Sequence, residues 1–310
     1  MKIVVTGGAG YIGSVLVSDL LNSGHKVTVI DNLIYNQTSL AHIIGNKNLE
    51  FVFKDIRNVS DIKKYYTQAD IIIPLAAIVG APACAKDPLL ATSTNKDAII
   101  EMLRTLSANQ RVIMPTTNSA YGSGDGLSYC DEQSELKPLS LYAKDKVEIE
   151  KIVMENHNAT SFRLATVFGV SPRMRLDLLV NNFVHRALKD KFIVLFEGNF
   201  KRNYIHLVDV VQAFNLAIDY PEKFKGQIFN VGLSDANISK NELCEKIKKY
   251  LPDFVYFNSN IGNDPDKRNY LVSNKKIEDA GFKHTVNLDS GIAELIKGLS
   301  IFQNKQFSNV

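Results

Sequence analysis

The sequence of 310 residues contains few cysteines and no long apolar run. Cys84, Cys130 and Cys244 lie far apart, so we expect neither a disulfide framework nor a metal site, and a reducing cytoplasm is the predicted location. No stretch approaches the roughly 20 apolar residues that a membrane helix needs. Because Met1-Lys2 leads directly into a predicted strand, we expect no signal peptide and no association with a membrane.

The sequence also lacks a strong excess of one charge. Its 36 Lys and Arg residues nearly balance 33 Asp and Glu residues, and the cations are spread along the chain. A nucleic acid is therefore not an expected partner, whereas single cations can meet the phosphates of a small ligand. A hydrophobic content of 45% and a charged content of 22% are typical of a globular protein, and the length allows one large α/β unit with an appended lobe.

A nucleotide-binding pattern is present at the N-terminus. Residues 2–6 form a β-branched run that predicts a buried parallel strand, and residues 14–22 have helical spacing. Between them the glycines follow the spacing G-x-x-G-x-x-G, which permits a tight turn and a close approach of the backbone to a pyrophosphate at a helix N-terminus. We therefore predict that this loop binds the diphosphate of a dinucleotide through Gly7, Gly10, Tyr11, Ile12 and Gly13.

An acidic residue follows the second predicted strand, residues 26–30. Asp31 comes about 20 residues after the glycines, where its carboxylate can accept both hydroxyls of an adenosine ribose. Asn32 and Leu33 follow it in place of an arginine, so NAD is favoured over NADP, whose 2′-phosphate would face the carboxylate. After a third predicted strand, residues 49–53, Asp55 is expected to meet the adenine amino group beside Ile56, with a helix cap as the alternative for Asp55.

Small residues end the fourth predicted strand, which lies within residues 69–77. Leu75, Ala76 and Ala77 leave space for a cofactor to lie across the sheet. A helix is predicted over residues 95–107, with Asn95 as a further cofactor contact, and a strand is predicted over 111–114. Residues 161–169 are predicted to form a sixth strand and a turn that closes over the nicotinamide. This order of elements predicts an α/β fold with a Rossmann-like, doubly wound parallel sheet.

A tyrosine and a lysine stand four residues apart at the start of a predicted helix, residues 142–156. Tyr142 and Lys146 therefore share one helix face, where the ammonium can lower the pKa of the phenol. A tyrosine with a lowered pKa can take a proton from a sugar or alcohol hydroxyl while a hydride leaves for a nicotinamide. Thr117 follows the predicted strand 111–114, and its hydroxyl can hydrogen-bond the reacting group. The alternative for the pair alone is a solvated helix face.

These features occur in the order found in the extended short-chain dehydrogenase/reductases, and the chain resembles the NAD-dependent sugar-nucleotide epimerases and dehydratases of that superfamily over nearly all of its length. The resemblance implies that Thr117 is the catalytic hydroxyl, that Ser119 contacts the substrate, that Tyr142 is the base and that Lys146 binds the nicotinamide ribose. Related 4,6-dehydratases carry Asp-Glu directly after the catalytic threonine. This chain has Asn118-Ser119 instead, which disfavours dehydration.

The second half of the chain resembles the substrate-binding part of the same family. Asn181 resembles the asparagine that holds the diphosphate side of the sugar nucleotide. The segment from Arg202 to Asp209 matches the family signature R-x-Y-I/V-H-V-x-D, so Arg202 is expected to fork onto a pyrophosphate, and Arg268 is a second arginine expected near the nucleotide. His206 and Asp209 are expected to be structural.

Two further arginines, Arg173 and Arg175, leave two interpretations open, because they fit solvated loop charges and ligand-binding residues equally well. The predicted domains are an NAD-binding unit, residues 1–168 with a return segment 205–232, and an interleaved sugar-nucleotide lobe, residues 169–204 and 233–310. By resemblance, the chain is expected to form a homodimer or a higher homo-oligomer through helices 95–107 and 142–156.

Several strings resemble a subgroup of capsule enzymes, known from Campylobacter, that oxidise C4 of GDP-D-glycero-α-D-manno-heptose. They lie at residues 71–82, 117–119, 163–178 and 264–268. The resemblance implies NAD-dependent oxidation of a nucleoside diphosphate sugar to a 4-keto sugar, for capsule or surface polysaccharide. One alternative is a sugar-nucleotide 4-epimerase such as UDP-glucose 4-epimerase, which shares the first half-reaction. A more distant alternative is a non-catalytic NAD-binding protein.

Overall fold

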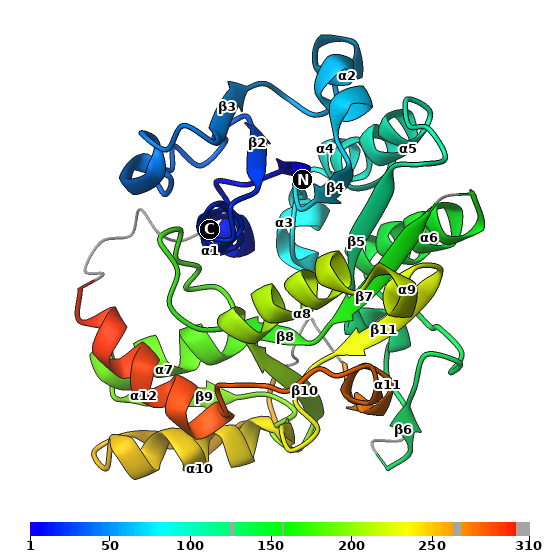
Figure 1. Cartoon of the computed structure of the whole chain (residues 1–310). Coiled ribbons are helices and arrows are strands. Elements are labelled where there is room, and N and C mark those ends of the chain that lie inside the picture. The colour runs from blue at the N-terminus through cyan, green and yellow to red at the C-terminus, as the bar shows by residue number, and fades with distance from the viewer. Residues whose placement is uncertain (125–126, 157, 263–267, 302–310) are drawn as a thin grey trace.

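A seven-stranded sheet, parallel throughout, forms the centre of the computed structural model, which describes residues 1–310 except 125–126, 157, 263–267 and 302–310. The first strand lies inside the sheet, and the strand order continues outward from it in both directions, as in a doubly wound fold (Figure 1). In spatial order the strands are β11 (Gln227–Val231), β7 (Ala159–Leu164), β5 (Arg111–Thr117), β4 (Ile71–Pro74), β1 (Lys2–Thr6), β2 (Lys26–Asp31) and β3 (Leu49–Phe53).

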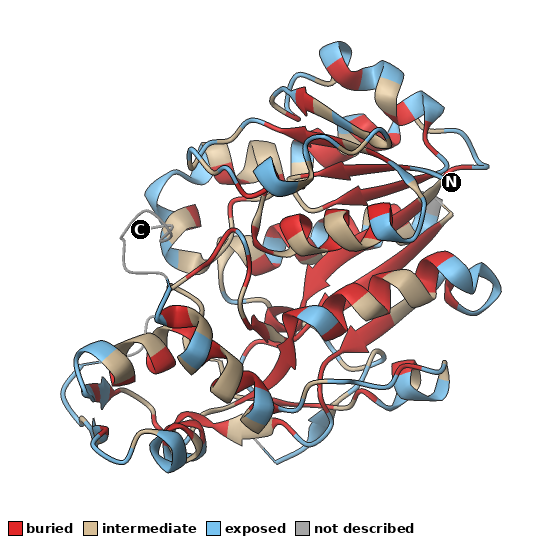
Figure 2. Ribbon diagram, turned by 60° about the vertical axis from the view of Figure 1, so that its left-hand side comes forward, coloured by how far each residue is buried: buried red, intermediate tan, exposed pale blue. Residues whose placement is uncertain are grey.

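Helices cover both faces of this sheet, so the strands are apolar on both sides. In β1, Ile3 and Val5 face one apolar core and Val4 faces the other, because successive side chains of a strand point to opposite faces. One face is covered by α1 (Tyr11–Asn22) and α8 (Leu207–Asp219). The opposite face is covered by α2 (Val59–Gln68), α5 (Ala98–Leu103) and α6 (Leu141–Asn156). Figure 2 shows the buried strands between these layers, and the predicted doubly wound parallel sheet is confirmed.

The helix predicted over residues 95–107 differs from the observed segment at both ends. The helical path begins earlier, with α4 (Pro88–Thr92), because the Asp87 side chain accepts a hydrogen bond from Leu90 N and proline suits the first helical position. It continues through a π-helical turn, η2 (Ser93–Asp97), into α5, which ends at Leu103. A short helix, α3 (Ala81–Lys86), precedes this segment.

The segment 161–169, predicted as one strand and a turn that closes over the nicotinamide, contributes to two strands that belong to different sheets. β7 ends at Leu164, and Ala165 N then donates to Val231 O at 2.9 Å. β8 (Thr166–Phe168) leaves the large sheet and pairs in parallel with β10 (Lys201–His206), which pairs antiparallel with β12 (Asn237–Ser239). The chain therefore passes from the large sheet into the lobe at the carboxyl end of β7.

The lobe consists of short strands and helices packed beside the large sheet (Figure 1). α10 (Lys240–Tyr250) begins after Ser239, which forms a capping box with Glu242. The chain returns to the large sheet through α8, α9 (Pro221–Phe224) and β11. The other elements are α7 (Leu179–Lys189), α10 (Lys240–Tyr250), α11 (Lys275–Asp279), α12 (Leu288–Leu299), η1 (Ala41–Ile43), η3 (Asn118–Tyr121), the parallel pair β9 (Phe192–Leu195) and β13 (Val255–Asn258), and the parallel pair β6 (Tyr129–Cys130) and β14 (Leu271–Val272).

None of the helices in the described part of the chain combines the length and the apolar character that crossing a membrane requires.

Candidate active site

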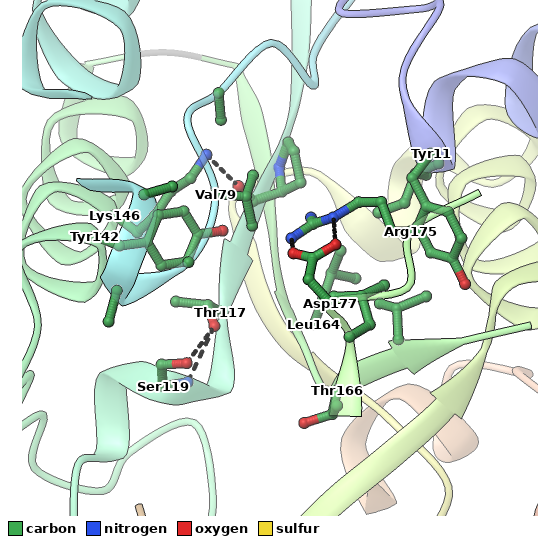
Figure 3. Close-up of a pocket in the computed structure, with 18 of the residues that line it drawn as sticks. Tyr11, Val79, Thr117, Ser119, Tyr142, Lys146, Leu164, Thr166, Arg175 and Asp177 are labelled. Atoms are coloured by element: carbon green, nitrogen blue, oxygen red, sulfur yellow. Dashed lines mark hydrogen bonds and ion pairs between the residues drawn. The ribbon is translucent and has the colours of Figure 1, made fainter. Parts of the chain in front are cut away.

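A cavity of about 450 Å³ opens at the carboxyl ends of β1, β4, β5 and β7, between the large sheet and the lobe (Figure 3). Ligands of doubly wound sheets bind at this edge, where the loops after the strands converge. The cavity brings together predicted site residues that lie far apart in the sequence. Of the predicted site residues, those that line it are Gly7, Gly10, Tyr11, Ile12, Gly13, Leu75, Ala77, Thr117, Ser119, Tyr142, Lys146, Arg202 and Arg268.

A smaller cavity of about 100 Å³ adjoins the large one over the glycine loop. The two cavities share Gly7, Gly10, Tyr35, Leu75 and Ala77 as lining residues, so a ligand can extend from one into the other. The smaller cavity is lined by the predicted cofactor-binding residues Asp31, Asn32, Asp55, Ile56 and Ala76.

The glycine loop itself forms the wall between the strand β1 and the helix α1. Gly7 has a φ of +66°, and a Cβ atom there would lie 2.5 Å from Ala76 N. A Cβ atom at Gly13 would lie 2.5 Å from Gly7 O. Because no side chain fits at either position, the backbone itself faces the cavity at the N-terminus of α1. This cradle fits the diphosphate of a dinucleotide such as NAD.

Asp31 lies at the end of β2 beside the smaller cavity with a fixed carboxylate. Its Oδ2 accepts a hydrogen bond from Ala9 N at 3.0 Å, and its Oδ1 accepts one from Leu33 N at 2.9 Å. Burial raises the pKa of this carboxyl, and the two backbone donors oppose that effect. The fixed carboxylate is oriented as an acceptor for the ribose hydroxyls, which supports the predicted preference for NAD.

Asp55 lines the smaller cavity but is already engaged by its neighbours. Its carboxylate is paired with Arg57, at 2.7 Å, and accepts a hydrogen bond from Asn32 Nδ2 at 3.3 Å. The hydrogen bonds from the Arg57 side chain lower the pKa of Asp55. The charge of this carboxylate is therefore partly neutralised where the adenine was predicted to meet it.

Asn95 was predicted to contact the cofactor, but in the structure it is fully buried and does not line either cavity. Its Oδ1 accepts a hydrogen bond from Ile78 N at 2.8 Å, and its Nδ2 donates to Ile78 O at 2.9 Å. Asn95 thus holds the loop after β4 in place from the side of the π-helical turn. The local sequence shows the polar residue but not the backbone that it binds, which lies 17 residues earlier.

Tyr142 and Lys146 both face the large cavity from α6, as the four-residue spacing predicted (Figure 3). The predicted effect of Lys146 on the phenol is wrong for the ligand-free protein. Burial raises the pKa of Tyr142 to about 12, and the charges that oppose this are those of Arg175 and Arg268. Lys146 Nζ instead donates to Pro115 O at 3.1 Å, and burial lowers its own pKa to about 8.

Thr117 and Ser119 place two hydroxyls at the carboxyl end of β5, on the cavity wall near Tyr142 (Figure 3). Thr117 Oγ1 donates to Ser119 Oγ at 3.0 Å and accepts from Ser119 N at 3.1 Å. Arg268 Nη1 also donates to Ser119 Oγ. These contacts fix both hydroxyls beside an arginine, so a substrate oxygen that enters the cavity meets hydrogen-bonding groups with a defined orientation.

Arg173 and Arg175 are buried residues of the cavity wall, so the interpretation as solvated loop charges is wrong. Arg175 pairs with Asp177, with 2.5 Å between Nη2 and Oδ2, and both side chains face the cavity (Figure 3). Arg173 lies over the ring of Tyr35, with 4.9 Å between Cζ and the ring centre. Met174 between the two arginines is buried as well, which the local sequence did not show.

Asn181 is also a correction, because it does not line the cavity where the diphosphate side of the sugar nucleotide was expected. Its Oδ1 accepts a hydrogen bond from Gly169 N at 3.1 Å. Its Nδ2 donates to Tyr11 Oη at 3.2 Å and to Arg175 O at 2.9 Å. Asn181 therefore connects the glycine loop to the loop that holds the two buried arginines.

Arg202, by contrast, is a buried residue of the large cavity, as predicted, on β10. The two other polar residues of its signature are structural. His206 Nδ1 accepts a hydrogen bond from Val208 N at the start of α8, and Asp209 accepts bonds from Thr285 N at 2.6 Å and Val286 N at 3.3 Å. In the described part of the chain, no three His, Cys, Asp or Glu side chains are grouped so that they could hold a metal ion.

Comparison with known proteins gives a consistent picture. Residues 3–232 match the model of the NAD dependent epimerase/dehydratase family. The putative UDP-glucose 4-epimerase of Methanocaldococcus jannaschii is 28% identical, over 95% of this chain and 97% of that protein. The UDP-glucuronic acid decarboxylase 1 of Arabidopsis thaliana is 27% identical, over 98% of this chain and 70% of that protein.

Solved structures share the fold. The UDP-glucuronic acid 4-epimerase from Bacillus cereus, in complex with UDP-glucuronic acid and NAD, superposes with a TM-score of 0.85 at 24% identity and covers 97% of this chain and 100% of its own. The UDP-glucose 4-epimerase of Thermotoga maritima, with UDP-glucose, also gives 0.85 at 24% identity, over 98% of this chain and 100% of its own.

Proposed function

This chain belongs to the NAD-dependent epimerase/dehydratase family, and we propose that it oxidises the C4 hydroxyl of a nucleoside diphosphate sugar to a 4-keto sugar. The observation that carries the proposal is the joint position of Tyr142, Lys146 and the hydroxyls of Thr117 and Ser119 in one cavity that continues over the glycine loop. A general base must lie within hydrogen-bond reach of the proton that it removes, and a sugar hydroxyl in this cavity can come within that distance of Tyr142.

Different residues of the chain bind the cofactor and transfer the proton. The glycine loop and Asp31 hold the cofactor's diphosphate and ribose. NAD, when bound, accepts the hydride that leaves C4. Tyr142 takes the proton of the C4 hydroxyl onto its phenol oxygen, and Thr117 hydrogen-bonds the same C4 oxygen. Because burial raises the pKa of Tyr142, nearby cations have to favour the phenolate. Lys146, which donates to Pro115 O in the ligand-free protein, would hold the nicotinamide ribose and would supply a positive charge near the phenol.

Arginines indicate the class of substrate. Among the described residues of the cavity wall, five have cationic side chains, Lys146, Arg173, Arg175, Arg202 and Arg268, and one has an acidic side chain, Asp177. An arginine guanidinium binds a phosphate through two parallel hydrogen bonds, so this excess suits ligands that bear diphosphates. We propose that Arg202 and Arg268 hold the diphosphate of the sugar nucleotide, with Ser119 on the sugar.

The finer proposal is release of the 4-keto product, so that the protein is a 4-dehydrogenase with GDP-D-glycero-α-D-manno-heptose as its substrate. It rests on the strings at residues 71–82, 117–119, 163–178 and 264–268, which resemble that subgroup. The second candidate is a C4 epimerase, in which the keto sugar turns and takes the hydride back. The similarity to the putative UDP-glucose 4-epimerase favours this candidate.

The assembly and the division into units are also proposals. We propose a homodimer, or a higher homo-oligomer, in which the helical segment 95–107 and α6 pair with those of a second copy. We further propose that residues 1–168 with 205–232 form the cofactor unit and that residues 169–204 with 233–310 bind the sugar nucleotide. Light scattering on the purified protein tests the assembly, and a monomeric mass contradicts it.

The deciding experiment follows nicotinamide absorbance and the sugar product by NMR, with GDP-heptose, GDP-mannose and UDP-glucose in parallel, each with and without a keto-acid acceptor. A 4-keto product that increases with the acceptor is the expected result. A C4 epimer without net reduction of the cofactor supports the epimerase instead. Tyr142→Phe is the control, because turnover that survives it contradicts the proposed base, and no turnover of any sugar by the wild type supports a non-catalytic NAD-binding protein.

A further inference from the structure

The loop between β8 and α7, residues 169–178, carries an ion pair on the wall of the large cavity. Arg175 Nη2 lies 2.5 Å from Asp177 Oδ2, and Arg175 Nε donates to Asp177 Oδ1 at 3.2 Å, so the two side chains meet through two parallel hydrogen bonds. The side chain of Arg175 is 10% exposed and that of Asp177 is 21% exposed. The pair is therefore largely withdrawn from water, although it borders the cavity.

Two consecutive asparagines near the start of α7 fix the backbone that carries this pair. Asn181 Nδ2 donates to Arg175 O at 2.9 Å, and Asn182 Nδ2 donates to Leu176 O at 3.0 Å. Asn181 Oδ1 also accepts a hydrogen bond from Gly169 N at 3.1 Å, at the other end of the same loop. Because the loop is held at several points, the pair presents a fixed arrangement of donors and acceptors to the cavity.

The pair faces the reaction centre. In Figure 3, Arg175 and Asp177 are drawn across the cavity from Tyr142, and neither of them lines the smaller cavity, where the adenosine half of the cofactor is expected. Burial raises the pKa of Tyr142, and the charge of Arg175 is the largest effect that opposes it, so the guanidinium acts on the phenol across the cavity. A sugar whose C4 oxygen reaches Tyr142 therefore has the pair close to its other substituents.

This pair has both donors and acceptors left for a ligand. A guanidinium has five N–H groups and a carboxylate has about four acceptor positions, and the pair uses two of each. A sugar hydroxyl is a donor and an acceptor at once and fits both groups, whereas a carboxylate is only an acceptor. The carboxylate of a uronic acid would meet the like charge of Asp177, and its approach to Arg175 would leave that partly buried acid without its partner.

We propose that the Arg175–Asp177 pair selects neutral sugars and rejects uronic acids, because it exchanges hydrogen bonds with the hydroxyls of the sugar. The inference rests on the proposed function, since it requires a sugar nucleotide bound with C4 at Tyr142. Asp177 determines the choice, because removal of its charge leaves a guanidinium that can fork onto a carboxylate. The competing role is a structural one, in which the pair holds the loop and contacts no ligand.

The test is calorimetric titration of the protein loaded with NADH, because the reduced cofactor cannot accept a hydride and binding is measured without oxidation. GDP-mannose is compared with GDP-mannuronic acid, and UDP-glucose with UDP-glucuronic acid, so the members of each pair differ only at C6. The wild type is expected to bind the neutral member at least about tenfold more tightly. Asp177→Asn keeps the shape of the side chain but removes its charge. This variant is expected to bind the uronate about 10–100-fold more tightly than the wild type, and the neutral sugar about 2–10-fold less tightly.

The matched control is Asp190→Asn, which breaks the pair of Asp190 with Arg186 at the end of α7, where neither residue lines either cavity. Its four affinities are expected to equal those of the wild type. A loss of structure does not produce a gain of affinity for the uronate, so a merely structural pair predicts none. The proposal is overturned if the wild type binds the uronate as tightly as the neutral sugar, or if Asp177→Asn leaves the ratio of the two affinities unchanged.

Failure of the proposed function gives a different result. A wild type that binds none of the four nucleotides contradicts the sugar-nucleotide function itself, and the inference is then overturned with it. Should Asp177→Asn not fold, the double variant Arg175→Gln with Asp177→Asn decides, because it removes both charges of the pair together. Its preference for the neutral sugar is expected to be weaker than that of the wild type, and an unchanged ratio of affinities overturns the proposal.

Discussion

Glu150 provides the sharpest test of what holds α6, the helix of the proposed catalytic residues Tyr142 and Lys146, against the large sheet. Tyr142, Lys146 and Glu150 are spaced four residues apart, so they lie on one face of α6. Glu150 pairs with Arg163 of β7 at 2.6 Å, and both side chains are 5% exposed. Its Oε2 also accepts a hydrogen bond from Thr116 Oγ1 at 2.9 Å, one residue before Thr117, the proposed catalytic hydroxyl. We expect the Glu150→Gln variant to have both a lower free energy of unfolding and a lower turnover than the wild type.

The magnitude follows from burial. Removing one partner of a buried ion pair leaves an uncompensated charge, here on Arg163, and costs about 3–5 kcal/mol of the free energy of unfolding. The whole free energy of unfolding of a native protein is only about 5–15 kcal/mol, so this loss is large. Asp190→Asn is the matched control, because it breaks the half-exposed pair with Arg186 on α7 and should cost about 0.3–0.5 kcal/mol.

Urea unfolding of each protein at pH 7, analysed by linear extrapolation, measures these values. The double variant Glu150→Met with Arg163→Met removes both charges and should be more stable than Glu150→Gln alone. The reasoning is refuted by a loss below about 1 kcal/mol in Glu150→Gln, or by a double variant that is less stable than the single one. In either case the pair would not be what fixes α6 to the sheet.

Three further outcomes are expected. Tyr142→Phe should lower turnover about 10²–10⁴-fold while the calorimetric NAD affinity stays within about threefold, because the variant lacks the phenol of the proposed general base. Lys146→Met should inactivate the enzyme yet stabilise the ligand-free protein at pH 7 by about 2 kcal/mol. Burial lowers the pKa of Lys146 from 10.5 to about 8, which destabilises the wild-type fold by about 3 kcal/mol below pH 8, and the variant removes this cost. The variant also loses the hydrogen bond to Pro115 O, which lowers its stability by about 1 kcal/mol. This gain in urea stability should vanish as pH rises from 8 to 10.5, and an equal gain at pH 11 contradicts it. Asn95→Ala should release the loop at Ile78, weaken NAD binding measured by calorimetry and lower stability by about 1–3 kcal/mol; unchanged values contradict its positioning role.

Local pattern predicted the parts of the site that depend on neighbours in sequence. The glycine spacing predicted a cradle at Gly7 and Gly13 because only glycine fits there, and the four-residue spacing placed Tyr142 and Lys146 on one helix face. Asp31 was found because the residue that follows a parallel strand lies at the ligand-binding edge of the sheet.

The tertiary structure decided whatever depends on burial and on partners distant in the chain. Sequence spacing does not show that Arg173 is enclosed beside Tyr35, that Asn181 turns toward Gly169 and Tyr11, or that Asn95 holds Ile78. The pKa of Tyr142 is set in the same way. A single cation four residues away predicts a lowered pKa, but the desolvation caused by packing from other elements outweighs it, because the cost of burying a charge depends on everything that surrounds the group.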